Sequence, residues 1–561
     1  MLWNGGQAGN RRLEKPQESV KGLSMDANSH PMKKHPRPAL MEARTQSKVM
    51  CARSTHIQNT DSQRMLSRAS RGVSSLVVIT LSAGCALLGG TSGGIHRDAA
   101  DAILDAPPLD QVHFGVLAVE LRTGRILYSR NAHRKFVPAS NQKILVTATA
   151  ISLLGPNYRY GTEVWATGSV MGSLLDGDLV ILASGDPSMS DRYWESGEAT
   201  LAAIADSLYQ KGLRDVAGSV FVDVSAWDST TVGPTWEVED LRFTHGATGG
   251  AFAIDEGEIS VIIRAGPAVG SPATLEWSPV GTPDYVRARI TTVPPDSGLQ
   301  VRPSYLPETR LLELTGQIEL YKTDTLMFAL RDPVRQATAA LGTAIERAGI
   351  KLQSGAHIAW SEGYRVGRGC LSGSVRECPN AGLVLTLESP PLSDLIAGIL
   401  KPSQNWMTEQ LIRTLGAELG EKGSWSEGVR IMTEFLTEVV GVDSLDISPR
   451  DGSGLSAYNL VTPRALVRIL QYLSSDQNSG AYRSAMASPG EEDSTLEERL
   501  LGLEGRVFAK TGTISNVNSL SGYLTRDDGS EVVFSILSNG SGLPSGQVRA
   551  AIDDLVRILA R

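Results

Sequence analysis

A serine followed three residues later by a lysine begins the apolar run "VPASNQKILVTATA", residues 137–150. If a helix begins near Ser140, the side chains of Ser140 and Lys143 lie one turn apart on the same face. A serine hydroxyl becomes a strong nucleophile when a base takes its proton, and a lysine can be that base only while it is neutral. The pair therefore indicates nucleophilic catalysis, while a helix cap followed by a solvated lysine is the plainer interpretation.

A second polar motif, "KPSQNWMTE", contains Ser403, Gln404 and Asn405 at or between helical segments. A serine can shuttle a proton, and an asparagine amide can donate to a substrate carbonyl while it orients a lysine. Taken alone, this tripeptide is as well explained by a helix cap.

A third motif, "AKTGTISN", contains Lys510, Thr511, Gly512 and Thr513 in a strand context. The lysine and threonines can bind a carboxylate, and the glycine allows a substrate backbone to approach the strand closely. Lys510 could also supply the second positive charge that lowers the pKa of Lys143. A plain exposed strand is the alternative interpretation.

Together, and in this order, the three motifs resemble the signature of penicillin-binding proteins and serine β-lactamases. Over nearly the whole of the part that follows residue 95, the chain resembles the D-Ala-D-Ala carboxypeptidase/endopeptidase family, the class C low-molecular-mass penicillin-binding proteins. The matching segments are "PASNQKILVTATA", "LASGDPSM", "ESPPLSDLIAGILKPSQNWMTEQLIRTLG", "DGSGLSAYNLVTP", "RVFAKTGTISNVNSLSGYL" and "FSILSNG". A large insertion between the first two motifs is typical of that family. In β-lactamases and simpler carboxypeptidases the segment between these motifs is too short to contain such an insertion.

The resemblance implies a role for each motif residue. Ser140 would be the acylated nucleophile and Lys143 its general base, while Ser403 and Asn405 would relay protons and hold the substrate. The backbone N–H groups of Ser140 and Thr513 would form an oxyanion hole. The substrate backbone and terminal carboxylate would be bound by Lys510, Thr511, Gly512 and Thr513.

The resemblance also implies a pocket for the amine of a diaminopimelate side chain. In "PTWEVEDLRFTHGA" the matching residues are Trp236, Glu239 and Asp240, but Phe243 and His245 stand where the family usually has tyrosines. The side-chain preference therefore departs from the family pattern. A second serine–asparagine element, "DGSGLSAYN" at 451–459, is interpreted as a structural loop, because its glycines and serines suit turns.

Hydrophobic patterning then places these motifs in elements. Two strands flank the turn at 122–125, and the helical pattern that follows stops at Gly155-Pro156. Residues 161–371 are strand-rich, with one helix from after Pro333 to about Ala348, and helical patterns return after Cys378. Three strands and a helix at 547–561 end the chain. The expected fold is an α/β (α+β) penicillin-binding-protein/serine β-lactamase-like transpeptidase fold, with a peptidase domain at 100–160 and 372–561 split by a β-rich insertion at 161–371.

The N-terminal part differs in composition from the rest. Residues 1–64 are polar and lack a periodic apolar run, so they are expected to be disordered, or not translated if synthesis begins at Met65. Residues 65–95 read as a signal peptide, with Arg68 and Arg71 before an apolar stretch that ends at Leu88. "LSAGC" also resembles a lipoprotein box with Cys85 as the lipidated residue; simple cleavage and an uncleaved membrane anchor are the alternatives. Each places the protein in the periplasm or at the outer face of the cell envelope.

Cysteines and charge narrow the chemistry further. Export implies an oxidising compartment, so Cys370 and Cys378 in "CLSGSVREC" are expected to form a disulfide, with two free thiols as the alternative. No His or Cys residues have metal-ligand spacing, and neither a metal nor a cofactor is expected. The formal net charge of −8 argues against nucleic-acid binding, which needs a basic face.

The sequence thus predicts a serine-type D-Ala-D-Ala carboxypeptidase that hydrolyses peptidoglycan stem peptides, with cleavage of D-Ala–diaminopimelate cross-links as a further activity. β-Lactam antibiotics would be covalent inhibitors. A non-catalytic peptidoglycan-binding scaffold on the same fold is one alternative, and a β-lactamase or esterase is another.

Overall fold

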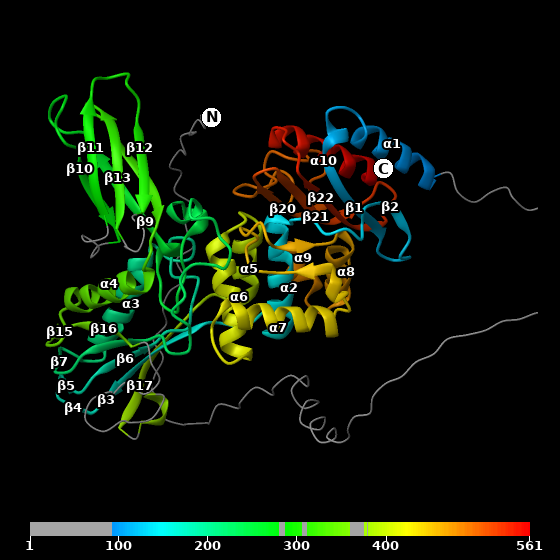
Figure 1. Cartoon of the computed structure of the whole chain (residues 1–561). Coiled ribbons are helices and arrows are strands. Elements are labelled where there is room, and N and C mark those ends of the chain that lie inside the picture. Colours follow the sequence, from blue (N-terminus) through cyan, green and yellow to red (C-terminus); the bar gives the residue numbers. More distant parts are fainter. Residues whose placement is uncertain (1–91, 280–285, 306–310, 360–374, 379) are drawn as a thin grey trace, which may run out of the picture. The chain divides into compact units, whose positions relative to one another are not determined.

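The computed structural model describes residues 92–279, 286–305, 311–359, 375–378 and 380–561 (Figure 1). The predictions for residues 1–64, for the signal peptide up to residue 91, and for Cys85 and Cys370 lie outside the described residues. Within the described ranges, no helix is both long enough and apolar enough to cross a membrane.

An antiparallel sheet joins the two ends of the chain in the strand order β2-β1-β22-β21-β20. Its strands are β1 (His113–Glu120), β2 (Ile126–Arg130), β20 (Val507–Ile514), β21 (Val517–Thr525) and β22 (Glu531–Asn539). Both faces of this sheet are buried. Along β1, Phe114 and Val116 pack into one core while Leu117 and Val119 pack into the other, as the two-residue period of a strand requires.

Helices cover both faces of this sheet. On one face lie α1 (Ser92–Leu104) and α10 (Ser545–Ala560), which share a core with Phe114 and Val116. On the other lies a helical cluster in which α2 contacts α5, α6, α7 and α8 (Figure 1). The cluster consists of α2 (Gln142–Leu153), α5 (Leu392–Leu400), α6 (Asn405–Leu419), α7 (Trp425–Glu438), α8 (Pro463–Ser475) and the short α9 (Ser479–Ser484).

Local sequence explains where several helices begin. The side chains of Ser424 and Thr462 cap α7 and α8 by accepting hydrogen bonds from backbone N–H groups of the first turn. Proline at the first position of α8 has no N–H to leave unsatisfied. Each cap fixes the residue at which its helix begins, and so determines which side chains the helix turns toward the core.

Among the described residues, the inserted part of the chain contains two α-helices and several small sheets. The helices α3 (Gly197–Gln210) and α4 (Pro333–Arg347) pack on each other and share a core with the strands around them. The strands nearest them are β3 (Gly161–Thr167), β4 (Ser169–Met171), β5 (Leu174–Asp176), β6 (Leu179–Leu182), β7 (Asp215–Val216), β8 (Val220–Asp223), β15 (Lys351–Leu352), β16 (Ala356–Ala359) and β17 (Ala381–Glu388).

A separate pair of three-stranded sheets, β10-β9-β14 and β11-β13-β12, surrounds its own core. Its strands are β9 (Glu258–Arg264), β10 (Thr274–Ser278), β11 (Val286–Val293), β12 (Gln300–Tyr305), β13 (Leu312–Glu319) and β14 (Thr323–Ala329). A two-stranded sheet, β18 (Ile447–Ser448) and β19 (Leu460–Val461), closes the loop at 449–459.

Two details of the predicted organisation are wrong. The sequence predicts one helix in the insertion, but α3 is a second, capped by the Ser196 side chain. The predicted return to the peptidase domain at residue 372 also comes too early, because β17 pairs antiparallel with β3 and so belongs to the sheet of the insertion.

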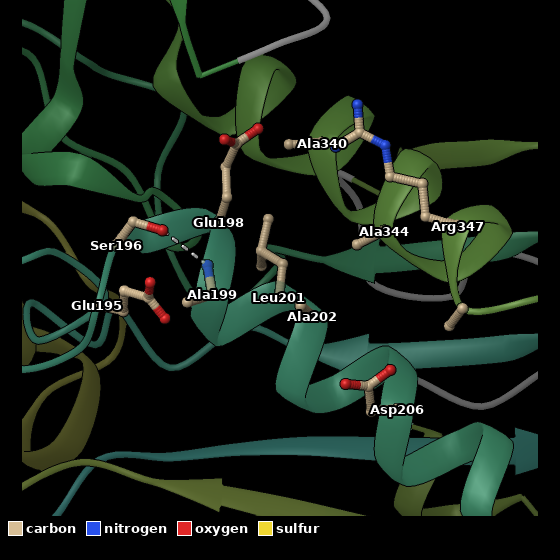
Figure 2. Close-up of a pocket in the computed structure, with 11 residues that line it drawn as sticks. Glu195, Ser196, Glu198, Ala199, Leu201, Ala202, Asp206, Ala340, Ala344 and Arg347 are labelled. Atoms are coloured by element: carbon tan, nitrogen blue, oxygen red, sulfur yellow. Dashed lines mark hydrogen bonds between the residues drawn. The ribbon is translucent and has the colours of Figure 1, made fainter.

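Between α3 and α4 lies a cavity of about 500 Å³ with an alanine-rich floor. Figure 2 shows the side chains that line it, of which Glu195, Ser196, Glu198, Asp206 and Arg347 are polar or charged. No residue of the three sequence motifs lines this cavity, so it is separate from the predicted catalytic residues.

Candidate active site

Ser140 lies in a 3-10 turn, Ala139–Asn141, that leads directly into α2. Ala139 has a left-handed backbone (φ 48°), a conformation that is costly for a residue with a Cβ and that persists where the surroundings enforce it. The Asn141 side chain fixes the turn to the sheet by donating to the carbonyl of Lys510 at 3.0 Å. The turn leaves Ser140 half-buried, whereas residues 142–151 of α2 are fully buried.

Lys143 is fully buried, and its Nζ lies 3.0 Å from Ser140 Oγ. The same nitrogen lies 2.7 Å from Asn405 Oδ1 and 2.9 Å from the carbonyl oxygen of Ser453. A neutral amine has two N–H bonds and one lone pair. Because the oxygens of Asn405 and Ser453 can only accept, they take the two N–H bonds, and the lone pair is left to face the Ser140 hydroxyl.

Burial lowers the pKa of Lys143 to about 7, because removal from water disfavours the charged ammonium. The carboxylates of Glu409 and Asp451 act in the opposite direction and raise the pKa of Lys143. Burial outweighs them, so a substantial fraction of Lys143 is neutral near pH 7.

The second motif is held at the start of α6. Ser403 has a positive φ of 69°, and Gln404 caps α6 by accepting from the Met407 backbone N–H at 2.9 Å. The Gln404 amide also donates to the carboxylate of Glu256, from the insertion. Asn405 is thereby aimed at Lys143 through Oδ1, while its Nδ2 donates to the His245 carbonyl at 2.9 Å. Within the described part of the chain, the Ser403 hydroxyl has no hydrogen-bond partner.

Lys510 is fully buried on β20 and donates to the carbonyl of Thr511 at 3.0 Å. The sequence predicts that the charge of Lys510 lowers the pKa of Lys143. In the structure burial is the main cause at Lys143, and the repulsion acts on Lys510, whose pKa is lowered well below its usual range by burial and by the charge of Lys143. Thr511 donates to Thr495 Oγ1 at 2.8 Å, and Thr513 is exposed at the end of β20.

Gly512 also has a role in the packing of the protein itself. A Cβ at this position would lie 2.8 Å from the Ser140 backbone nitrogen and 2.9 Å from the Pro138 carbonyl oxygen. Since real Cβ atoms do not approach so closely, the glycine allows β20 to lie against the Ser140 turn. The protein's own packing therefore requires Gly512, whatever the substrate does.

We expect Gly512→Ala to lower the free energy of unfolding by about 1–3 kcal/mol, the usual cost of overpacking, and to slow acylation of Ser140 because the turn is displaced. Denaturant unfolding and the rate of labelling by a serine-acylating reagent measure the two effects. Gly382→Ala is the matched control, because Gly382 also lies in a strand and a Cβ there would meet no atom within 4 Å. Equal behaviour of the two variants would contradict the packing argument.

The predicted side-chain pocket is brought to the site only in part. Trp236 Nε1 donates to Asp451 Oδ2 at 3.0 Å, and Asp240 Oδ1 lies 3.3 Å from His245 Nε2. His245 in turn accepts the hydrogen bond from Asn405 through its carbonyl. Glu239 is exposed, and within the described residues its side chain makes no hydrogen bond or ion pair with the three motifs.

Four residues that the sequence did not assign to the site complete it: Glu409, Asp451, Ser453 and Thr495. Ser453 contributes its backbone carbonyl, which every residue type has, so the sequence gives no sign of this role. Asp451 lies in the loop interpreted as structural, and Asn459 is buried in that loop and donates to Asp451 Oδ1 at 2.7 Å. The only visible signal for Glu409 was its position one helical turn after Asn405.

The assembled geometry can perform acyl transfer. It combines a half-exposed serine hydroxyl, a buried amine that can take its proton, and an amide that orients the amine. The disulfide prediction concerns a different place: Cys378 is disulfide-bonded, and its predicted partner Cys370 lies outside the described residues.

Known proteins are similar to this chain in sequence and in fold. A D-alanyl-D-alanine carboxypeptidase of Actinomadura sp. (strain R39) is 29% identical over 474 residues, which cover 82% of this chain and 84% of that protein. The crystal structure of penicillin binding protein 4 (dacB) from Haemophilus influenzae has the same fold, with a TM-score of 0.69 at 21% identity over 82% of this chain and 99% of that one. Residues 96–561 match the family model of the D-Ala-D-Ala carboxypeptidases 3 (S13). The chain therefore belongs to the D-Ala-D-Ala carboxypeptidase 3 (S13) family.

Proposed function

We propose that this protein is a serine-type D-Ala-D-Ala carboxypeptidase that hydrolyses peptidoglycan stem peptides through an acyl-enzyme on Ser140. The observation that carries the proposal is the fully buried Lys143 amine, 3.0 Å from Ser140 Oγ and oriented by Asn405. Family membership supplies the substrate class.

The acylation step follows from this geometry. Neutral Lys143 takes the hydroxyl proton as Ser140 Oγ attacks the carbonyl carbon of the penultimate D-Ala. The backbone N–H groups of Ser140 and Thr513 stabilise the oxyanion. The peptide C–N bond then breaks, and the proton passes from Lys143 to the departing amine, with the Ser403 hydroxyl as relay. D-Alanine leaves, and the stem peptide remains as an ester on Ser140.

Hydrolysis of the ester repeats the proton transfers in reverse. A water molecule gives a proton to Lys143 as it attacks the ester carbonyl, the bond from carbon to Ser140 Oγ breaks, and Oγ takes the proton back. Thr511 and Thr513 would hold the terminal carboxylate, next to Lys510 on the same strand. A β-lactam would acylate Ser140 in the same way, but its departing amine stays tethered in the opened ring, so the adduct persists.

The proposal extends to D-Ala–diaminopimelate cross-links, in which the departing amine belongs to a second stem peptide. Trp236 and Asp240, which lie next to Asp451 and His245, are the residues that would meet its side chain. Digestion of purified sacculi followed by mass analysis tests this extension: loss of cross-linked dimers is expected, and loss of terminal D-Ala alone would overturn it.

The proposal also places the protein outside the cytoplasmic membrane, in the periplasm or at the outer face of the envelope. It is supported by the basic and apolar pattern at residues 65–88 and by the disulfide at Cys378, a bond that is typical of oxidising compartments. Attachment through the N-terminal segment is part of the same proposal.

Release of D-alanine from diacetyl-L-Lys-D-Ala-D-Ala by the purified protein tests the function. We expect steady turnover that benzylpenicillin blocks. Labelling by a fluorescent penicillin without any D-alanine release would instead indicate a non-catalytic penicillin-binding scaffold. Rapid hydrolysis of nitrocefin would indicate a β-lactamase.

Acylation should depend on pH through Lys143. Because only the neutral amine accepts the Ser140 proton and its pKa is about 7, the rate of acylation by benzylpenicillin is expected to rise tenfold per pH unit below that value and to level off above it. Stopped-flow measurement from about pH 5 to about pH 9 checks this, within the range in which the protein stays folded. A rate still rising at pH 9 would mean that Lys143 titrates as an ordinary exposed lysine.

A further inference from the structure

Glu409 is a buried carboxylate that the proposed mechanism does not use. It lies on α6 one turn after Asn405 and is 1% exposed. Its Oε1 accepts from the Ser453 backbone N–H at 2.6 Å, and its Oε2 accepts from the Gly452 N–H at 2.9 Å and from Trp425 Nε1 at 2.7 Å. A carboxylate that takes three N–H donors in the interior is firmly held.

Glu409 holds the residue whose carbonyl orients Lys143. It accepts from the N–H groups of Gly452 and Ser453, and the Ser453 carbonyl accepts from Lys143 Nζ at 2.9 Å. That carbonyl belongs to the next peptide unit, whose N–H, on Gly454, donates to Asp451 Oδ1 at 2.9 Å. The surrounding backbone is tightly packed, because a Cβ on Gly452 would lie 3.0 Å from the Thr408 carbonyl oxygen. The loop at 449–459 therefore packs directly on α6, and the hydrogen bonds of Glu409 fix its distance from the helix.

We propose that Glu409 is a positioning residue of the reaction, which fixes the Ser453 carbonyl so that the lone pair of Lys143 faces Ser140 Oγ. This assignment rests on the proposed function. Asn405 Oδ1 and Ser453 O are the two acceptors that determine the direction of the amine, and both are tied to α6: Asn405 covalently, and Ser453 through Glu409. A displaced carbonyl would let the amine turn, and misplacement of about 1 Å can cost on the order of 100-fold in rate.

Glu409 also acts on Lys143 through its charge. The charged groups around the two are Asp451, whose oxygens accept four hydrogen bonds from its own loop, Asn459 and Trp236; Lys510 on β20; and Arg413, which pairs with Asp228. Burial and the charge of Asp451 raise the pKa of Glu409. Ionised Glu409 raises the pKa of Lys143, so loss of this charge would leave Lys143 neutral down to lower pH.

The pH profile of acylation by benzylpenicillin separates the two effects. We expect Glu409→Gln to slow acylation above pH 8 by about 10- to 100-fold, because the amide NH2 cannot accept the donors that Glu409 binds, and to move the acidic limb to lower pH. Glu409→Asp keeps the negative charge, but its shorter side chain does not reach the N–H groups of the loop. We therefore expect its acylation rate to fall while the acidic limb of its pH profile stays in place. Trp425→Phe removes one donor and leaves the loop bonds, so its rate falls less than tenfold.

Glu120→Gln is the matched control, because it removes a carboxylate that is 6% exposed on β1, away from Lys143. Thermal unfolding of each variant shows that it is folded, and Glu409→Asp and Trp425→Phe keep the test available if the glutamine variant does not fold. The assignment of Glu409 would be overturned if Glu409→Gln kept the acidic limb of the pH profile in place and acylated as fast as Glu120→Gln, or slowed only in proportion to its loss of stability. That result would leave the proposed function intact. A wild-type protein that benzylpenicillin does not acylate would overturn the proposed function and this assignment with it.

Discussion

Ser140→Ala is expected to lower D-alanine release by on the order of a millionfold, the size of effect seen when a serine protease loses its nucleophile. The residue is the only hydroxyl at 3.0 Å from the buried amine among the described residues, so no other side chain can form the ester in its place. Labelling by a fluorescent penicillin should disappear together with turnover. The substitution removes one half-buried oxygen, so the thermal unfolding temperature should change little.

Ser152→Ala is the matched control for this variant. Ser152 lies on the same α2 helix, and its Oγ has no hydrogen-bond partner within the described residues. It should keep full turnover and full labelling. Persistent labelling of the Ser140→Ala protein would show that another residue carries the acyl group.

Lys143→Met is expected to slow acylation by about 10²- to 10⁴-fold, the usual contribution of a general base. Methionine fills the space of the buried side chain but cannot take the Ser140 proton, so the hydroxyl stays a weak nucleophile. The rate of adduct formation with benzylpenicillin, followed by intact mass, measures the loss. Folding should persist, because a buried amine is replaced by an apolar group.

Lys143→Arg distinguishes a base from a charge. Arginine keeps a cation next to Ser140 but does not lose its proton at any pH the protein tolerates. We expect it to be as impaired as Lys143→Met. Near-normal acylation by the arginine variant would mean that the positive charge, and not proton transfer, activates Ser140. Lys211→Met, on the exposed end of α3, controls for the loss of a lysine elsewhere.

Much of the fold could be predicted because its signals are local. The alternation of Phe114, Val116 and Ala118 with Leu117 and Val119 marks a strand buried on both faces, and the helical spacing in α10 marks its apolar side. The family resemblance then supplied the split architecture. The fold class agrees with that of penicillin binding protein 4 (dacB) from Haemophilus influenzae.

The errors lie where pairing is distant in sequence. No local pattern shows that Ala381–Glu388 pairs with Gly161–Thr167, because strand partners are chosen by tertiary packing. The second helix of the insertion, α3, did have a signal: Ser196 as a cap and Leu201, Ile204 and Leu208 at helical spacing. The helix was missed because the segments on both sides of it have strand patterns.

The site was predictable in its side chains and not in its backbone. Ser140, Lys143 and Asn405 are distinctive in type and spacing, and the structure brings them within hydrogen-bond distance. The second acceptor for Lys143 is a backbone carbonyl, which any residue at position 453 would supply. Likewise, the burial that lowers the pKa of Lys143 depends on the finished packing.

The most direct test of the central claim is to identify the residue that carries the acyl group. The purified protein is incubated with benzylpenicillin, digested, and sequenced by tandem mass spectrometry. We expect a single adduct on Ser140, absent from the Ser140→Ala protein. An adduct on Ser403 or on any other residue, or no adduct at all, would contradict it.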